Sequence, residues 1–336
     1  MEKLKIVSGM RSTGKLHLGH YMGVLTNWVE LQKDYDSYFF VADWHALTTK
    51  YDKTENLKQD TREVVLDWLG SGLNPEQSTI FVQSMVPETA EMNIYLSMIT
   101  PQNWVERDPT LKDMAKMLRG DGSGAKTETI SYGLLGYPVL MSADILTFNA
   151  DVVPVGVDQL AHLEITRDIA RRFNNIYKTD FLKEPAPKLT QVPLLCGIDG
   201  QKMGKSFNND IKISDTEEET TKKIMKCITD RSRMRKDDLG HPEQCEVAYK
   251  YYEIFADEET VKTCACECCA GKRGCADCKR QLASIINEKF APVREKRAEY
   301  AKDMSYVDDV LADGAKKARV EAQKVISKVR SLINMY

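Results

Sequence analysis

Short apolar runs alternate with amphipathic segments of helical length over the first two hundred residues, and this alternation constrains the fold more than any other sequence feature. β-branched and aromatic residues form candidate strands at 5–8, 38–42, 79–83, 152–155 and 191–195. Candidate helices lie between them at 20–31, 57–69 and 159–173. This order is typical of βαβ units and predicts an α/β fold with a Rossmann-like, doubly wound parallel sheet. Such sheets bind ligands beyond the carboxyl ends of their strands, where the strand order changes direction.

The pattern changes after about residue 213, where the candidate strands end. Ser214 and Glu217 form a capping-box pattern, which predicts that a helix begins there. The longest helical patterns follow at 279–300 and 316–334. The C-terminal part of the chain is therefore expected to be helical.

These patterns predict two domains. Residues 1–212 would form the Rossmann-like domain that carries the active site, and residues 213–336 would form a smaller helical domain. A connection at about 100–135 is inserted into the first domain, and its segment 121–128 is a loop rich in Gly and Ser.

Composition narrows the class of protein further. With 42% hydrophobic and 29% charged residues, the chain is not a disordered tail, a collagen or a coiled coil. No window approaches 18 uncharged apolar residues, and the N-terminus lacks the apolar run of a signal peptide, so we expect no membrane partner and a cytoplasmic location. The net charge of −3 gives no overall basic field that would attract nucleic acid.

A polar turn follows the first candidate strand. Residues 8–14 lead into His17-Leu18-Gly19-His20 at the start of a helix. Free N–H groups and the positive end of the helix dipole favour a phosphate at such a point. His17 and His20 can donate hydrogen bonds to phosphate oxygens as charge develops, and Gly19 leaves the backbone open to a flat base. The motif alone is equally compatible with a helix start that carries two surface histidines.

A second motif, Lys202-Met203-Gly204-Lys205-Ser206, lies in a loop that follows the candidate strand at 191–195. Two lysines and a serine are suited to hold the triphosphate of ATP. Adenylate transfer needs no enzyme nucleophile, because a substrate carboxylate attacks the α-phosphorus, so the protein contributes positioning and positive charge while Mg²⁺ shares the pyrophosphate charge. A Lys-x-x-Lys loop alone is usually only solvated surface, but the two motifs together indicate an ATP site.

Both motifs resemble the two signatures of the class I aminoacyl-tRNA synthetases, and the chain as a whole is similar to the tryptophanyl-tRNA synthetase family. The stretches that carry the resemblance are 8–14, 40–46 (Phe-Val-Ala-Asp-Trp-His-Ala), 137–146 (Tyr-Pro-Val-Leu-Met-Ser-Ala-Asp-Ile-Leu) and 155–174. The last stretch is the most specific, since it matches in spacing and residue type over twenty positions. The resemblance implies a set of catalytic residues: His17, Gly19, His20, Lys202, Lys205 and Ser206.

The resemblance also implies a tryptophan pocket in which Asp144 accepts the indole N–H. A lone acceptor in an apolar pocket rejects analogues that lack the donor. Met141 and Tyr137 precede it by three and seven residues on one predicted helix and would wall the pocket. Gln159 and His45 match positions that hold the polar end of the amino acid.

Other interpretations of this pocket remain open at the level of sequence. Without the resemblance, Asp144 would be a polar helix residue or a cap, and His45 a core histidine. Tyrosyl-tRNA synthetases also place an aspartate in the pocket, so Asp144 does not separate the two amino acids. The flanking stretches 141–146 and 155–159 favour tryptophan.

The ATP contacts that the resemblance implies come from the two signatures and two later segments: Arg11, Ser12, Thr13, Gly19, His20, Gly156, Val157, Asp158, Val192, Lys202, Met203, Gly204, Lys205 and Ser206. Asp158 suits a ribose hydroxyl. Several positions depart from the family pattern, with Gly204 in place of Ser, Val157 in place of Glu, Arg11 where many bacterial relatives have Gln, and Ser12 in place of Pro. Both lysines are kept, so we expect activity, with an altered rate.

Cysteine is concentrated in one segment, since seven of the nine cysteines lie between Cys245 and Cys278. A reducing cytosol makes disulfides improbable, and such density more often indicates a metal than cysteines that merely lie near one another. Cys245, Cys268, Cys275 and Cys278 are separated by 22, 6 and 2 residues. Four thiolates suit either structural Zn²⁺ or a [4Fe–4S] cluster, and the spacing alone does not decide between them.

The resemblance favours iron–sulfur, because a subset of tryptophanyl-tRNA synthetases carries this spacing around a [4Fe–4S] cluster in the anticodon-binding domain. Three further cysteines, Cys264, Cys266 and Cys269, create alternative ligand sets.

Basic residues gather beside these cysteines although the net charge is negative. The residues are Lys222, Lys223, Lys226, Arg231, Arg233, Arg235, Lys236, Lys272, Arg273, Lys279 and Arg280. They could hold phosphates of an anticodon stem, or they could be an ordinary solvated helix face.

Taken together, the resemblance implies a homodimeric ligase that activates L-tryptophan with Mg-ATP and transfers it to the 3′ end of tRNA(Trp). The connection at about 100–135 would lie at the dimer interface. Two alternatives remain at this stage: a non-catalytic paralogue that binds tryptophan or tRNA as a sensor, and a tyrosyl-tRNA synthetase.

Overall fold

The centre of the protein is a five-stranded sheet in which every strand pairs in parallel with its neighbours, in the order β3-β2-β1-β4-β5. The computed structural model describes residues 3–107, 131–189, 195–235 and 237–336. The strands are β1 (Lys5–Arg11), β2 (Asp36–Ala42), β3 (Ser78–Val82), β4 (Val152–Val155) and β5 (Ala186–Leu189). The predicted Rossmann-like α/β fold is confirmed, as are four of the predicted strands. The candidate strand at 191–195 lies outside the described residues except for Leu195, and the fifth strand comes from the segment just before it.

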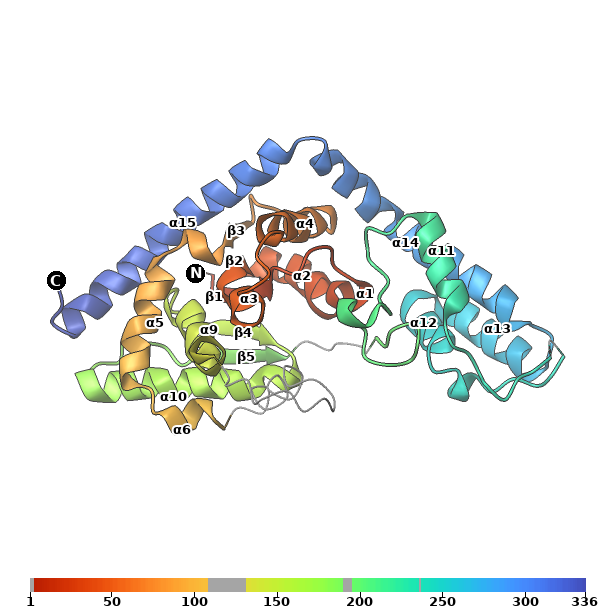
Figure 1. Ribbon diagram of the computed structural model, residues 1–336, viewed down its shortest axis with the longest axis horizontal. Coiled ribbons are helices and arrows are strands. Elements are labelled where there is room, and N and C mark those ends of the chain that lie inside the picture. Colours follow the sequence, from red (N-terminus) through yellow and green to blue (C-terminus); the bar gives the residue numbers. More distant parts are fainter. Residues whose placement is uncertain (1–2, 108–130, 190–194, 236) are drawn as a thin grey trace.

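Helices connect the strands and cover both faces of the sheet (Figure 1). The three predicted helices of this half are confirmed, although the first is broken into α1, a π-helical turn and α2. In chain order the elements are α1 (Leu18–His20), η1 (Tyr21–Leu25), α2 (Thr26–Asp34), α3 (Asp43–Lys50), α4 (Leu57–Gly70), η2 (Gln83–Met85), α5 (Glu88–Ile99), α6 (Gln102–Val105), α8 (Tyr132–Leu135), α9 (Tyr137–Leu146), η3 (Val157–Gln159) and α10 (Leu160–Tyr177).

The alternation of side chains along the strands divides the core into two layers. In β2, Phe39 and Val41 face a cluster that includes Trp28 of α2 and Trp68 of α4. Phe40 faces the other cluster, which contains residues of α9 and α15. Because β2 is buried on both sides, its sequence is a nearly continuous apolar run.

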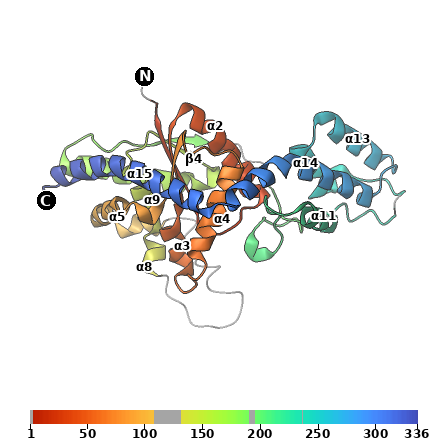
Figure 2. The ribbon, with the colours of Figure 1, turned by 90° about the horizontal axis from the view of Figure 1, so that it is seen from above.

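The C-terminal region is helical, as predicted, and ends in two long helices that meet at an angle (Figure 1). Its elements are η4 (Lys205–Phe207), α11 (Glu217–Lys226), η5 (Pro242–Gln244), α12 (Ala248–Phe255), α13 (Glu258–Cys269), α14 (Cys275–Ala301) and α15 (Met304–Leu332). Figure 2 shows α11, α13 and the first part of α14 at one end of the molecule, and α15 beside α5 at the other.

The predicted capping box is wrong by two residues. Helix α11 begins after Thr216, whose side chain accepts from Glu219 N while the Glu219 carboxylate accepts from Thr216 N. Ser214 does not cap the helix, because the chain between it and Thr216 is still in a turn where Lys212 N donates to Asp215. Two overlapping patterns of the same type were present, and the later one forms.

Helix α15 returns from the helical end and packs on the sheet. At Gly314 the helix passes so close to β3 that an added Cβ would lie 1.7 Å from the carbonyl oxygen of Ile80. A glycine is therefore required at this crossing. No helix within the described residues is long and apolar enough to span a membrane.

Candidate active site

A cavity of about 1660 Å³ opens at the carboxyl ends of β1 and β4. The strand order changes direction between these two strands, which is where the sequence predicted a ligand site. The cavity is lined by thirteen of the predicted site residues: Arg11, His17, Gly19, His20, His45, Tyr137, Met141, Asp144, Gly156, Val157, Gln159, Lys202 and Met203. The predicted amino-acid pocket and the predicted ATP site are therefore two parts of one continuous space.

Asp144 lies at the inner end of this cavity and is almost completely buried, at 4% exposed. His45 Nε2 lies 2.8 Å from Oδ2, and Gln83 Nε2 donates to Oδ1 at 2.6 Å. Burial raises the pKa of Asp144, whereas the hydrogen bonds to His45 and Gln83 act in the opposite direction. A carboxylate has about four acceptor positions, so these two neighbours orient Asp144 and leave acceptor capacity for a ligand.

Gln83 is a residue of this site that the sequence analysis missed. It is 1% exposed at the end of β3, and its Oε1 accepts from Trp44 N at 3.1 Å while its Nε2 reaches Asp144. Both ends of the amide are therefore fixed. The available signal was position, because a polar residue directly after a buried strand lies at the ligand edge of a parallel sheet.

A second buried chain of polar groups, from α9 and α10, also lines the cavity. Tyr137 Oη lies 2.6 Å from His162 Nε2, and His162 Nδ1 lies 3.0 Å from Gln159 Oε1. Tyr137 and Met141 lie on α9 with Asp144, as the spacing predicted. His162 is only 1% exposed and was also missed, because a histidine on the buried face of a helix is typical of an ordinary core position.

His17 and His20 stand at the outer part of the cavity, with ring centroids 3.8 Å apart. Burial lowers the pKa of His17 to about 4, although the charge of Asp210 acts in the opposite direction. Burial, followed by the charges of His17 and Lys205, lowers the pKa of His20 to about 3. Both rings are thus neutral near pH 7. They can donate N–H groups to a phosphate without adding a full positive charge.

The positive charge at this end comes from the second motif. Lys205 Nζ donates to the carbonyl oxygens of Thr13 at 2.6 Å and Gly14 at 2.8 Å, so the lysine loop lies against the turn after β1. Burial lowers the pKa of Lys205 to about 8, which still leaves it mostly protonated at pH 7. Lys202 is exposed and lines the cavity from the same loop.

Asn209 holds the lysine loop in shape. Its Nδ2 donates to Asp199 Oδ1 and to the Lys202 carbonyl, and its Oδ1 accepts from Gly204 N at 2.9 Å. Gly204 has a φ of −170°, which is extended backbone that any residue adopts. Glycine is thus not required here by the backbone, although the usual residue of the motif is serine.

Some of the predicted ATP-binding residues do not line the cavity or lie outside the described part of the chain. The Ser12 hydroxyl is buried against α4, where it lies 2.8 Å from Thr61 Oγ1, and so it points away from the cavity. Val192 lies outside the described residues, and the side chains of Asp158 and Ser206 are not described either. Arg11, at the end of β1, does line the cavity, and its guanidinium donates to Thr49 Oγ1.

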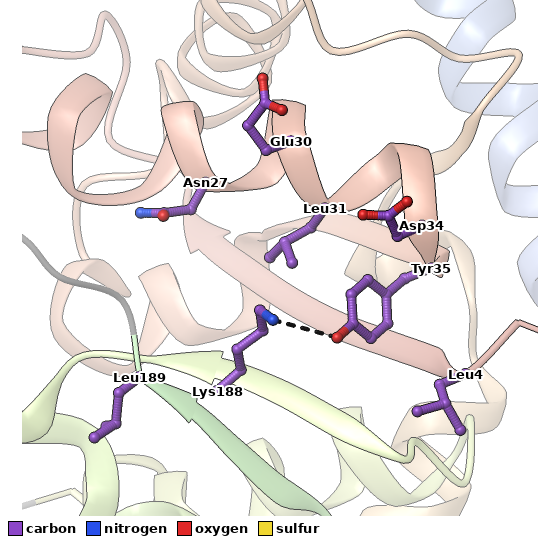
Figure 3. Close-up of a pocket in the computed structure, with 8 residues that line it drawn as sticks. All are labelled: Leu4, Asn27, Glu30, Leu31, Asp34, Tyr35, Lys188 and Leu189. Carbon is purple, nitrogen blue, oxygen red and sulfur yellow. Dashed lines mark hydrogen bonds between the residues drawn. The ribbon is translucent and has the colours of Figure 1, made fainter.

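A second, smaller cavity of about 500 Å³ lies between α2, the start of β1 and the edge strand β5 (Figure 3). Lys188 donates to Tyr35 Oη across it at 3.3 Å, and Glu30 and Asp34 of α2 add acidic groups. It contains none of the predicted site residues. The predicted catalytic and binding residues are therefore concentrated at the large cavity.

Comparison with known proteins agrees with this geometry. The family model described as tRNA synthetases class I (W and Y) matches residues 1–291. The chain belongs to this family. The tryptophan–tRNA ligase of Thermotoga maritima is 45% identical over 99% of both chains, and that of Aquifex aeolicus is 40% identical over 99% of this chain and all of the relative.

Solved structures of the family give the same result. The tryptophanyl-tRNA synthetase of Campylobacter jejuni, complexed with ADP and tryptophan, superposes with a TM-score of 0.87 at 33% identity, covering 99% of this chain and 100% of the other. A tyrosyl-tRNA synthetase from Archaeoglobus fulgidus, at 19% identity and a TM-score of 0.64, shares the fold. These neighbours confirm the class I synthetase architecture with its helical C-terminal region.

The four predicted ligand cysteines of this synthetase lie at the helical end. Cys245 follows η5, Cys268 is in the last turn of α13, and Cys275 and Cys278 are in the first turn of α14. Burial raises the pKa values of Cys245 and Cys268, and the nearby thiols of Cys275 and Cys278 raise them further. Even so, no three His, Cys, Asp or Glu side chains converge as metal ligands anywhere in the described residues.

One of the additional cysteines has a clear position. Cys264 is buried, and its Sγ lies 3.5 Å from Sγ of Cys278. Cys266 and Cys269 are exposed on α13. Cys264 is thus the neighbour that could compete with the predicted ligand set.

Several of the predicted basic residues of the synthetase are already engaged within the protein. Arg273 contacts Glu267 and stacks over Tyr252, and Arg233 donates to Cys268 Sγ at 3.6 Å. Five exposed ones make no ion pair within the part of the chain that the structure describes: Lys222, Lys226, Arg231, Arg235 and Lys272. These five form the free basic group of the helical end.

Proposed function

We propose that the protein is a tryptophan–tRNA ligase that forms tryptophanyl-adenylate from L-tryptophan and Mg-ATP and transfers the tryptophanyl group to the 3′ end of tRNA(Trp). The observation that carries this proposal is one cavity with a buried, oriented carboxylate at its inner end and the two synthetase signatures at its outer end. Identity of 34–45% to ligases of this name over nearly the whole chain supports it.

In the proposed amino-acid pocket, Asp144 accepts the indole N–H at the inner end. His45 and Gln83 fix the carboxylate, and their hydrogen bonds oppose the rise in its pKa that burial causes. Met141 and Tyr137 wall the ring, and Gln159 takes the polar end of the amino acid. An indole that lacks the N–H would leave a buried acceptor unpaired, which is the physical basis of selectivity.

In the activation step the tryptophan carboxylate attacks the α-phosphorus of ATP, the bond to the bridging oxygen breaks, and pyrophosphate leaves. His17 and His20 donate N–H groups to the phosphate oxygens, while Lys202 and Lys205 offset the charge that develops on the leaving pyrophosphate. Mg²⁺, bound with ATP, shares that charge. Lys205 must leave Thr13 and Gly14 to reach the phosphates, so the loop is expected to close on ATP. A ribose hydroxyl of the tRNA then attacks the activated carbonyl, and AMP leaves.

The test is tryptophan-dependent exchange of pyrophosphate into ATP. We expect exchange by the wild-type protein and its loss in the double variant Lys202→Ala/Lys205→Ala. Exchange no greater than that of the double variant would leave the sensor alternative, in which the protein binds tryptophan or tRNA without catalysis. Exchange that depends on tyrosine instead would identify the tyrosine enzyme.

For tRNA binding we propose the free basic group of the helical end, which would hold phosphates of the anticodon stem. Charge-reversing two members, Lys226→Glu and Arg235→Glu, is expected to raise the KM for tRNA about tenfold while leaving pyrophosphate exchange unchanged. Equal loss in both assays would contradict this division.

We further propose that Cys245, Cys268, Cys275 and Cys278 hold a [4Fe–4S] cluster, which would cross-link η5, α13 and α14. The donor set supports this, because four thiols of the right chemistry lie at one end of the molecule, and a Cβ added at Gly240 would meet Cys268 Sγ at 2.3 Å. Anaerobically purified protein is expected to be brown, with a broad absorption band near ~400 nm and about four iron atoms per chain. A colourless preparation with one zinc would support the Zn²⁺ alternative.

A homodimer in the cytoplasm completes the proposal. Helix α5 presents Ile94 at 54% and Met98 at 79% exposure, just before the connection at about 100–135 that the resemblance implies at the interface. Sedimentation of the purified protein should give twice the chain mass, and Met98→Glu should shift it toward the monomer. A wild-type monomer would contradict the proposal.

A further inference from the structure

Asp67 of α4 is completely buried, and neither synthetase signature includes it. Its Oδ2 accepts from Leu16 N at 2.6 Å, directly before His17. Its Oδ1 accepts from Arg297 Nε of α14, also at 2.6 Å. One carboxylate therefore joins the backbone of the first signature to a side chain from the long helix that runs to the cysteine end.

The signature backbone is held on its other side by the segment that follows the lysine loop. Ile213 N donates to the Leu16 carbonyl, and Leu18 N donates to the Ile211 carbonyl at 2.9 Å. These bonds, together with the one to Asp67, fix the donors and acceptors on both sides of His17. The hydrogen bond to Asp67 thus ties the backbone directly before His17 to α4.

Arg297 reaches Asp67 because α4 and α14 pack closely. A Cβ added at Gly70 would lie 2.9 Å from Arg297 Cβ and 3.0 Å from the Val293 carbonyl oxygen. The guanidinium is largely buried, with 13% of its side chain exposed, and it also pairs with Glu63. A buried carboxylate without its cation would be costly, so a displacement of α14 would be felt directly at Asp67.

We infer that Asp67 is a positioning residue for the first signature, and that Arg297 makes this position depend on where α14 lies. The inference deepens the proposed function, since it rests on His17 and His20 acting on ATP. Asp67 does not line the cavity, so it acts through the Leu16 backbone. Movement of the helical end would thereby be transmitted to the activation site through two hydrogen bonds.

The experiment compares Asp67→Asn, Arg297→Met and Arg297→Lys in tryptophan-dependent pyrophosphate exchange. Displacing a reacting group by about 1 Å can cost ~100-fold, so we expect kcat to fall by ~10–100-fold in Asp67→Asn and Arg297→Met. The KM for tryptophan should stay within about twofold, because the amino-acid pocket is untouched. Arg297→Lys, which keeps the cation, should recover most of kcat.

The double variant Asp67→Asn/Arg297→Met should be no worse than the more impaired single variant, because both changes remove the same contact. The matched control is Arg62→Met, on α4 with Asp67. Arg62 pairs with Asp308 of α15 at 2.9 Å, and this ion pair between helices does not reach the signature. Equal loss in the control, or a parallel rise in the KM for tryptophan, would show that the effect is general destabilisation and would overturn the inference.

Hydrogen–deuterium exchange separates this inference from the proposed function. The peptide that contains the Leu16 amide should exchange at least ~10-fold faster in Asp67→Asn and Arg297→Met than in Arg62→Met, whether or not the protein activates tryptophan. An inactive wild type with this exchange pattern would defeat the proposed function and keep the positional link. If Asp67→Asn does not fold, the two Arg297 variants carry both measurements, and an unchanged Leu16 amide in them would overturn the inference.

Discussion

The active site at the sheet end and the cysteine group at the helical end were both predicted from sequence motifs, but they differ in what brings their side chains together. At the sheet end, Asp144, His45 and Gln83 come from separate segments, yet they meet within hydrogen-bond distance. His45 and Gln83 follow the parallel, buried strands β2 and β3, and helix α9 brings Asp144 to the same edge of the sheet. At the helical end, Cys268 and Cys275 are neighbours in the chain, and still no ligand set converges among the described residues.

The contrast between the two ends shows which kind of site forms by folding alone and which kind needs a ligand. Apolar burial of the strands fixes side chains at their ends, so the site exists before any ligand binds. Thiols on separate helices gain little by approaching one another, and the energy that would gather them is that of the bound metal. The sheet end is therefore expected to be preorganised, and the helical end to be completed by what it binds.

The largest expected effect is at Asp144. Asp144→Ala should lower kcat/KM for tryptophan by about 10³-fold, because the site then lacks the acceptor that pairs with the indole N–H. Pyrophosphate-exchange kinetics measure this, and the affinity for tRNA should be unchanged. The matched control is Met141→Leu on the same helix, which keeps an apolar wall and should lose less than about tenfold.

The contrary result for Asp144 would be a loss below about tenfold, which would mean that shape alone selects the amino acid. A parallel loss of tRNA affinity in Asp144→Ala would show that the sheet end and the helical end do not act independently, which would contradict the comparison between them.

The helical end should give the reverse pattern. Cys275→Ser is expected to remove the proposed cluster, to raise the KM for tRNA about tenfold, and to leave pyrophosphate exchange within about twofold of the wild type. Aminoacylation and exchange measured side by side on anaerobic samples test this. Cys266→Ser, at an exposed cysteine on α13, is the control and should change neither value.

If Cys275→Ser instead abolishes exchange, the helical end would be a structural requirement of the whole enzyme. A variant that keeps its iron and its tRNA affinity would mean that Cys264, 3.5 Å from Cys278, has replaced Cys275 as a ligand.

The sequence was most informative where local pattern and packing agree. Four predicted strands and the helix that carries Tyr137, Met141 and Asp144 are confirmed, because burial on a sheet or helix face leaves a periodic signal. Gln83 and His162 were missed because their function depends on partners from elements distant in the chain. Sequence periodicity carries no information about such a contact.

The cap of α11 illustrates a second limit. Ser214–Glu217 and Thr216–Glu219 carry the same pattern, and the one that forms depends on Asp215 accepting from Lys212 N. The capping-box rule alone does not choose between overlapping patterns. Tertiary placement of the preceding loop makes that choice.

After the predictions for Asp144 and Cys275, a smaller effect is expected at the sheet end: the free energy of unfolding should depend on pH through His17 and His20. His17 and His20 have pKa values lowered to about 4 and about 3, so the unfolded chain binds more protons than the folded one below the usual histidine pKa of 6.5. Stability should therefore fall as the pH drops from about 6.5 toward 4, by roughly 1 kcal/mol per histidine at pH 5.5. Urea unfolding at pH 7.5 and 5.5 measures this.

The control is His17→Asn/His20→Asn, which should flatten this part of the pH profile. If the slope is unchanged in the double variant, other groups titrate there and the two rings are already solvated. If the wild type is instead more stable at pH 5.5 than at pH 7.5, the pKa values of His17 and His20 are not lowered by folding.

The smallest effect is expected at Gly204, where the second signature departs from its family. Gly204→Ser should change kcat for pyrophosphate exchange by no more than about threefold, because φ is −170° there and a serine fits without strain. The added hydroxyl could donate to ATP only after the loop has closed, so the KM for tryptophan should not change. Gly204→Ala, with the same backbone and no hydroxyl, is the control. A gain above about tenfold in the serine variant alone would show that the sheet end lacks a needed phosphate donor, and that it is less complete before ligand binding than the comparison with the helical end implies.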